Sequence, residues 1–153
     1  MITAYRIVKK KWAKSSFDGE GARLYGGRWN SAGKACLYLA SSESLAILEI
    51  LVHLNAPKMV EEYELYSIEF DEKHTMLLCN ESLPYHWQED PAPQETAEIG
   101  DDWLSENTSL ALSVPSTIVV REKNYLININ HPLFEKTLTT IKKLEFKMDK
   151  RLI

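Results

Sequence analysis

Short apolar runs separated by polar turns predict a chain built mainly of strands, with one strongly apolar helix. Alternating or continuous apolar residues predict strands at residues 4–8, 35–40, 62–70, 75–79, 110–114, 117–120, 125–129 and 144–153. The run that begins at Ser41-Ser-Glu-Ser has a serine cap and an early acid. It stays apolar to Leu54, which predicts a helix that ends before Pro57.

The remaining segments carry signals of loops and of one surface helix. Residues 95–107 predict a surface helix that Gly100 weakens, and the proline-rich residues 84–93 predict an irregular loop. Residues 19–33 hold five of the six glycines and predict a built, glycine-rich loop. Because helices do not regularly separate the strands, the pattern favours an α+β domain with a mixed or antiparallel sheet.

Length and composition narrow the class of protein. A chain of 153 residues without repeats or a linker predicts one domain, residues 1–153. The net charge of −4 argues against nonspecific binding to nucleic acid. We expect a cytoplasmic protein, since we find neither a signal peptide nor a membrane span. Cys36 and Cys79 lie in apolar runs and are predicted to be buried and reduced. The four histidines lack metal-ligand spacing, so we expect no metal.

The glycine-rich loop also carries candidate binding residues. Arginine grips phosphate or carboxylate with a planar fork, and aromatic rings offer faces for another ring. The loop is therefore predicted to hold an anionic, ring-bearing ligand such as a nucleotide. The alternative is a hairpin loop whose arginines are solvated. The candidate substrate-binding residues are Arg23, Tyr25, Gly27 and Arg28, together with Tyr38 from the following strand.

Three further residues have both a chemical and a structural interpretation. Glu49 lies inside the most apolar helix, where a carboxylate either shifts its pKa or finds a partner. The alternative places it on a solvent-facing stripe made of Ser42, Ala46, Glu49, His53 and Ala56. Tyr38 also fits a core tyrosine, and Ser116 also fits an ordinary turn serine.

In combination these residues form a more specific pattern than any of them alone. The blocks, in chain order, are Gly26-Gly-Arg28-Trp-Asn, Tyr38-Leu-Ala-Ser-Ser, Leu48-Glu49, Val114-Pro-Ser116 and Asn124-Tyr-Leu-Ile-Asn128 before His131-Pro132. This pattern resembles the RES domain family, which is named for an arginine, a glutamate and a serine. The resemblance runs from about Tyr5 to the tail. It implies four catalytic positions, Arg28, Tyr38, Glu49 and Ser116.

The resemblance implies a fold similar to that of ADP-ribosyltransferases, with a mixed, split β-sheet and flanking helices. It also implies a bacterial toxin paired with an Xre-type helix-turn-helix antitoxin, in a complex that contains a homo-oligomer of the toxin. The implied activity is cleavage of the nicotinamide–ribose bond of NAD+, with water or phosphate as acceptor. NAD+ is then a substrate, and no cofactor is expected. Two alternatives remain, a protein ADP-ribosyltransferase and an inactive partner-binding RES domain.

The implied chemistry assigns a role to each matching residue. Positive charge grows on the ribose as nicotinamide leaves, and Glu49 would stabilise that charge. Arg28 would hold the pyrophosphate, or fix Glu49 and the ribose. Tyr38 would stack on or orient the nicotinamide ring, and Ser116 would bond the substrate or hold the catalytic groups.

Overall fold

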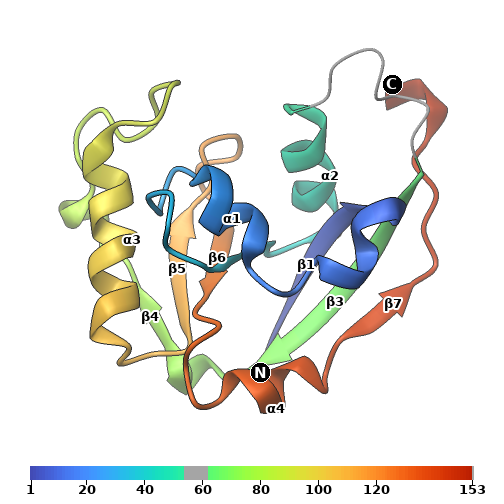
Figure 1. Cartoon of the computed structure of the whole chain (residues 1–153). Helices are drawn as coiled ribbons and strands as arrows, with labels where there is room; N and C mark the ends of the chain where they lie inside the picture. The colour runs from blue at the N-terminus through green and yellow to red at the C-terminus, as the bar shows by residue number, and fades with distance from the viewer. Residues whose placement is uncertain (54–61, 153) are drawn as a thin grey trace.

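A computed structural model describes residues 1–53 and 62–152, and within them seven strands form one mixed sheet (Figure 1). The strands are β1 (Ile2–Lys9), β2 (Leu37–Ala40), β3 (Tyr63–Phe70), β4 (Thr75–Leu77), β5 (Ala111–Pro115), β6 (Lys123–Ile127) and β7 (Lys142–Leu144). Their order in the sheet is β4-β5-β6-β2-β1-β3-β7. The β4–β5 pair is parallel and the other pairs are antiparallel.

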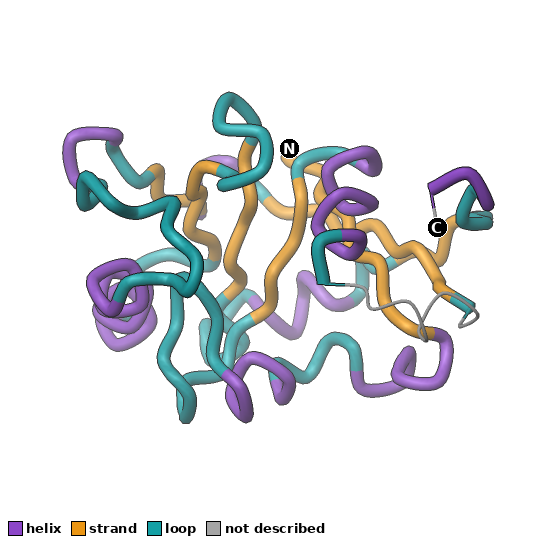
Figure 2. Tube along the Cα trace, turned by 90° about the horizontal axis from the view of Figure 1, so that it is seen from above, coloured by secondary structure: helices purple, strands orange, loops and turns teal. Residues whose placement is uncertain are grey.

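Four α-helices in the described part of the chain flank this sheet. They are α1 (Glu20–Tyr25), α2 (Glu43–Leu51), α3 (Gln94–Glu106) and α4 (Phe134–Leu138). In Figure 1, α3 runs beside β4 and β5, α2 stands over the middle of the sheet, and α4 lies at its lower end. The view from above shows helices on both sides of the strands (Figure 2). The α+β fold with a mixed sheet and flanking helices is therefore confirmed.

The sheet is split between β1 and β2. Strand β1 pairs with β3 in register from Ile2–Phe70 to Lys9–Tyr63, whereas its register with β2 consists of Tyr5–Ala40. Beyond that pair the two strands separate. The guanidinium of Arg6 bridges the gap, because its Nη1 donates to the carbonyl of Tyr38 at 2.8 Å. A cationic side chain thus substitutes for ladder hydrogen bonds at the split.

Buried apolar clusters fix the helices on the sheet. One cluster joins Trp29, Trp87 and Trp103 to Leu112 and Leu126, and so ties the glycine-rich segment and α3 to β5 and β6. A second cluster packs α2 on β1 and β3, and a third fills the sheet face near α4. Burial of these side chains supplies the main driving force for holding the site-bearing segments in place.

Several local predictions are wrong, each for a local reason. The predicted strand at residues 117–120 is a turn, because Ser116 Oγ accepts hydrogen bonds from the backbone amides of Ile118 and Val119, both at 3.1 Å. The predicted strand at 144–153 is misplaced, since β7 ends at Leu144 and residues 150–152 form a 3-10 helix. The predicted loop at 19–33 contains α1, and α4 was not predicted.

Two predictions about single residues also need correction. Cys36 is buried as expected and burial raises the pKa of its thiol to about 12, but Cys79 is exposed. The proposed solvent-facing stripe on α2 is mixed, because Ala46 is buried, Glu49 is half-buried and His53 is exposed. Ala56 and the predicted helix end near Pro57 lie outside the described residues.

Gly100, which seemed to weaken α3, is the residue that allows α3 to pack on the glycine-rich segment. A Cβ added at this position would lie 1.6 Å from the carbonyl oxygen of Trp29. That distance is impossible for any side chain, and the obstacle is backbone rather than a movable side chain. The helix can therefore approach the backbone at Trp29 only with glycine here.

We predict that Gly100→Ala lowers the free energy of unfolding by about 3 kcal/mol or more, since the added methyl forces α3 away from the backbone at Trp29. Gly21→Ala is the control, because a Cβ at this helical glycine meets nothing within 4 Å. That control should be neutral or stabilise by about 0.5–1 kcal/mol. Urea unfolding of both variants decides the matter, and similar stability for the two would contradict the packing argument.

Candidate active site

The Gly-Gly-Arg-Trp-Asn block forms a small, tightly bonded turn. Gly27 and Asn30 form a β-bridge, with the Gly27 amide 2.9 Å from the Asn30 carbonyl. The Asn30 side chain is buried and its Nδ2 donates to the carbonyls of Ala22 and Lys34, both at 2.9 Å. The asparagine therefore fastens the turn to both of its flanks. A loop with this many internal bonds presents a preformed surface.

Tyr38, which lies in β2, is hydrogen-bonded to this turn. Its hydroxyl donates to Asn30 Oδ1 at 2.5 Å and accepts from the Trp29 amide at 3.1 Å. Burial raises the pKa of this hydroxyl well above its ordinary value, so it stays protonated and keeps donating. A Cβ at Gly27 would lie 2.7 Å from the hydroxyl oxygen, which explains the need for glycine. Tyr38 is thus a half-buried tyrosine whose hydroxyl is fully used by the protein.

Helix α3 also forms hydrogen bonds with this turn. Thr96 Oγ1 donates to the carbonyl of Arg28 at 2.7 Å, and Asp101 Oδ1 accepts from the Ser31 amide at 2.9 Å. Together with the contact at Gly100, these bonds leave the backbone around Arg28 little freedom. Residues of β2 and α3 thus fix the backbone position of Arg28.

The Arg28 side chain reaches a distant segment. Its Nη1 donates to the carbonyls of Trp87 at 2.8 Å and Glu89 at 2.7 Å. One nitrogen of the guanidinium therefore holds the loop at residues 84–93, and neither Nε nor Nη2 makes a recorded bond within the described part of the chain. The charge of Arg28 also lies near enough to Glu49 to lower the pKa of that carboxyl. Arg28 thus serves both the loop and the carboxylate.

Glu49 is held by two side chains, one from the residue that follows β5 and one from β6. Ser116 Oγ donates to Glu49 Oε1 at 3.4 Å, and the Asn124 side chain also hydrogen-bonds the carboxylate. Ser116 is fully buried and already accepts two backbone amides, so its single proton is directed at Glu49. Removal of the Ser116 hydroxyl would therefore release both the Glu49 carboxylate and the turn at residues 116–119.

Burial dominates the ionisation of Glu49. The pKa of this carboxyl is raised from its ordinary 4.5, and burial is the largest cause. The bonds from Asn124 and Ser116, then the charges of His53 and Arg28, oppose the shift. A carboxylate that is partly shielded from water and held by hydrogen bonds interacts strongly with a positive charge that develops beside it.

The structure thus brings some predicted residues together and leaves others apart. Glu49 contacts Ser116, Arg28 acts on Glu49 through its charge, and Tyr38 reaches this group through the turn that carries Arg28. Arg23 lies on α1, where the exposed carboxylate of Glu20 pairs with it. Tyr25 is 85% exposed and belongs to the same helix. The binding roles of Arg23 and Tyr25 stay predictions.

Sequence reasoning missed three polar residues of this region. Asn124 bonds Glu49, Asn30 locks the turn, and Arg6 spans the split with a buried Nε that has no partner among the described residues. Asn30 and Asn124 were part of the RES-like pattern, so the signal was there, but no role followed from spacing. Nothing in the sequence around Arg6 marks it, because the split in the sheet is a tertiary feature.

Two absences apply to residues 1–53 and 62–152. No group of three or more His, Cys, Asp or Glu side chains in these ranges is arranged to hold a metal ion. No helix in them has the length and apolar character needed to cross a bilayer.

We predict that Glu49→Gln stabilises the protein at pH 7, since glutamine keeps an acceptor for Ser116 and removes a partly buried charge. The raised pKa means that the folded protein binds this proton more tightly, so Glu49 costs stability as pH rises through its folded pKa. The advantage of the variant should therefore shrink below about pH 4, under the ordinary carboxyl pKa. Urea unfolding between pH 3.5 and 7 measures it. A difference that grows on acidification would refute the desolvation argument.

Comparison with known proteins shows the family of this chain. The RES domain family model matches residues 3–149. A relative named Toxin Res from Yersinia enterocolitica is 46% identical over 148 residues, which are 97% of each chain. A relative named Prs ADP-ribosylating toxin from a Sphingobium species is 36% identical over 128 residues, or 80% of this chain and 78% of that one.

A solved structure supports the fold independently. A chain in the crystal structure of the M. tuberculosis MbcT-MbcA toxin-antitoxin complex is similar with a TM-score of 0.70 and 18% identity. The match covers 94% of this chain and 81% of that one. Since the family model spans nearly the whole sequence and the Yersinia enterocolitica relative aligns end to end, this chain belongs to the RES domain family.

Proposed function

We propose that this protein is the toxin of a bacterial toxin–antitoxin pair and that it cleaves the nicotinamide–ribose bond of NAD+. The observation that carries the proposal is the half-buried carboxylate of Glu49, held by Ser116 and Asn124 within the field of Arg28. A fixed anion of this kind suits a reaction that develops positive charge on a sugar. The name Toxin Res of the Yersinia enterocolitica relative supports the biological role.

The reaction follows from these groups. The bond between the ribose carbon and the nicotinamide nitrogen breaks, and its electron pair leaves with the ring as neutral nicotinamide. The positive charge left on the ribose is stabilised by the Glu49 carboxylate, which Ser116 and Asn124 hold in place. Water or inorganic phosphate then adds to the ribose carbon. Water loses a proton to solvent, which leaves ADP-ribose, whereas phosphate gives the 1″-phosphate of ADP-ribose.

The hydroxyl of Tyr38 has a role in addition to the one suggested by its ring. Since its hydroxyl is engaged by Asn30 and Trp29, it sets the position of the turn that carries Arg28. Arg28 would then present its remaining donors to the substrate while holding the loop at residues 84–93. We assign Tyr38 and Ser116 to positioning, and Glu49 to charge stabilisation.

A second candidate is transfer of ADP-ribose to a protein by the same bond cleavage. The name Prs ADP-ribosylating toxin, carried by a relative that is 36% identical, favours this candidate. Both candidates need Glu49 and release nicotinamide, and they differ only in the acceptor. A binding-only RES domain would release none.

The test is the release of nicotinamide from NAD+ by purified protein. Glu49→Ala should lower turnover by about two to three orders of magnitude, the usual loss for one electrostatic stabiliser. Glu43→Ala, at an exposed acid on the same helix, is the matched control and should keep parental turnover. Turnover by folded Glu49→Ala within threefold of the parent would contradict the assignment. Labelled protein after incubation with labelled NAD+ would favour the transferase.

We further propose that a cognate antitoxin with an Xre-type DNA-binding domain neutralises this protein by covering the region around Glu49. Expression of the parent should lower cellular NAD+ and arrest growth. Glu49→Ala, or co-expression of the antitoxin, should prevent both effects. Growth arrest with unchanged NAD+ that persists in Glu49→Ala would show that toxicity runs through another activity.

A further inference from the structure

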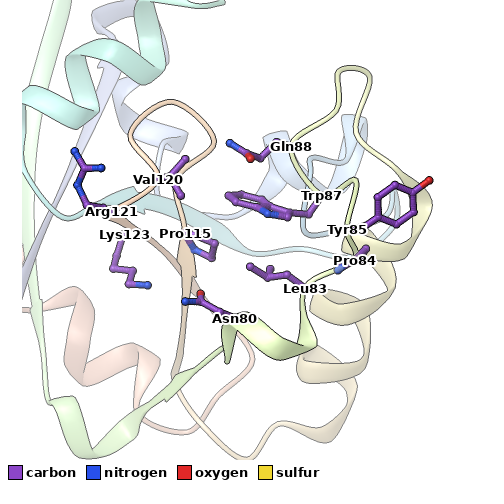
Figure 3. Close-up of a pocket in the computed structure, with 10 residues that line it drawn as sticks. All are labelled: Asn80, Leu83, Pro84, Tyr85, Trp87, Gln88, Pro115, Val120, Arg121 and Lys123. Atoms are coloured by element: carbon purple, nitrogen blue, oxygen red, sulfur yellow. The ribbon is translucent and has the colours of Figure 1, made fainter.

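We propose that a cavity beside the reaction centre binds the adenylate half of the dinucleotide, an assignment that rests on the proposed function. The cavity has a volume of about 530 Å³ and lies between the loop at residues 80–88 and the turn that joins β5 to β6 (Figure 3). Volumes of roughly 300–1,000 Å³ are usual for small-ligand sites. Pro115 is the one lining residue that also belongs to the blocks of the RES-like pattern, and none of Arg28, Tyr38, Glu49 and Ser116 lines this cavity.

The charge of the cavity wall selects an anion. Arg121 and Lys123 line the cavity, and no carboxylate belongs to its lining. The acid between them, Glu122, turns the other way and accepts a hydrogen bond from Ser42 at the start of α2. Within the described residues neither Arg121 nor Lys123 has an ion pair. Two cations that have no ion pair among the described residues, in a protein of net charge −4, indicate a site for a phosphate.

The rest of the wall suits a flat ring. Trp87 lines the cavity and in Figure 3 lies across from Pro115, with Leu83 below them. Trp87 is only 9% exposed, because its indole packs against Trp29 in the core, so the edge that it leaves at the cavity can pack with the Pro115 ring against a nucleobase. Figure 3 also shows Lys123 toward the Asn80 end of the cavity and Arg121 on the side away from Trp87. The cationic side chains thus lie at the rim, where a phosphate stays partly solvated.

The wall is connected to the predicted catalytic residues on two sides. Arg28 binds the carbonyl of Trp87, so the residue that lies near Glu49 also positions the ring wall. On the other side, Pro115 and Lys123 are the neighbours in sequence of Ser116 and Asn124, which bond Glu49. The cavity wall and the groups that hold Glu49 are thus built on the same backbone segments, and for this reason we assign the cavity to the other half of a dinucleotide whose ribose lies at Glu49.

The experiment is titration of the protein with AMP, followed by calorimetry and by the NMR signal of the Trp87 indole. AMP should bind the parent and shift the Trp87 signal. Lys123→Ala should weaken AMP about tenfold, the usual loss of one charge-assisted contact to phosphate. Arg121→Ala should weaken it by a smaller factor. Adenosine, which lacks the phosphate, should bind more weakly and should not respond to Lys123→Ala. Lys142→Ala on β7 is the control and should bind AMP like the parent.

The same variants separate this proposal from the proposed function. In NAD+ cleavage, Lys123→Ala should raise KM about tenfold and leave kcat within a factor of two. Glu49→Ala should still bind AMP. AMP binding by the parent that needs Lys123 supports the cavity assignment even if NAD+ is never cleaved. No AMP binding by the parent, or equal binding by parent and Lys123→Ala, overturns it even if NAD+ is consumed. Inorganic phosphate that binds as tightly as AMP would also overturn it, in favour of a free-phosphate site.

Discussion

The turn at Gly27–Asn30 is the constraint on which the rest of the site depends. It is clamped between the Tyr38 hydroxyl on one side and the backbone of α3 at Gly100 on the other. Both contacts are so close that only glycine fits at positions 27 and 100. A turn packed this closely on two sides has little room to shift. The backbone of Arg28 is therefore held in one position, and its side chain extends from there.

Burial of the Glu49 carboxylate has two opposing effects. A carboxylate that must stabilise a cation works best where water is scarce, but scarcity of water destabilises the carboxylate itself. The protein balances the two with Ser116 and Asn124, whose hydrogen bonds favour the charged form, and with the charges of His53 and Arg28. Ser116 follows β5 and Asn124 lies in β6, so the position of the carboxylate depends on the geometry of the β5–β6 turn. Local stability is given up here in exchange for a directed negative charge.

Much of the fold was readable from the sequence, because most strands and the two longer helices carry strong local signals. The serine cap of α2 is one example, since Ser42 does accept from the Leu45 amide. The turn after Ser116 was misread because its apolar residues look like a strand while a side-chain hydrogen bond closes the chain. The pattern also selected Arg28, Tyr38, Glu49 and Ser116, and the alternative of a core tyrosine fits the Tyr38 hydroxyl, which bonds the Trp29 amide and Asn30. Roles that depend on long-range contacts, such as those of Arg6 and Asn124, leave no mark in spacing or periodicity.

Arg28 shows why such a site resists reading from residue types. An arginine in a glycine-rich loop suggests a phosphate ligand, yet here one of its nitrogens is fully used on the carbonyls of Trp87 and Glu89. A lysine would keep the charge and could bond both carbonyls through its single nitrogen, but it would lack the rest of the planar fork, whose Nε and Nη2 make no bond among the described residues and stay free for a ligand. The same side chain therefore joins three things that are far apart in sequence: the clamped turn, the loop that carries Trp87, and the field at Glu49. If substrate binding requires that loop, loss of the fork would impair binding and chemistry together, although the charge itself was kept.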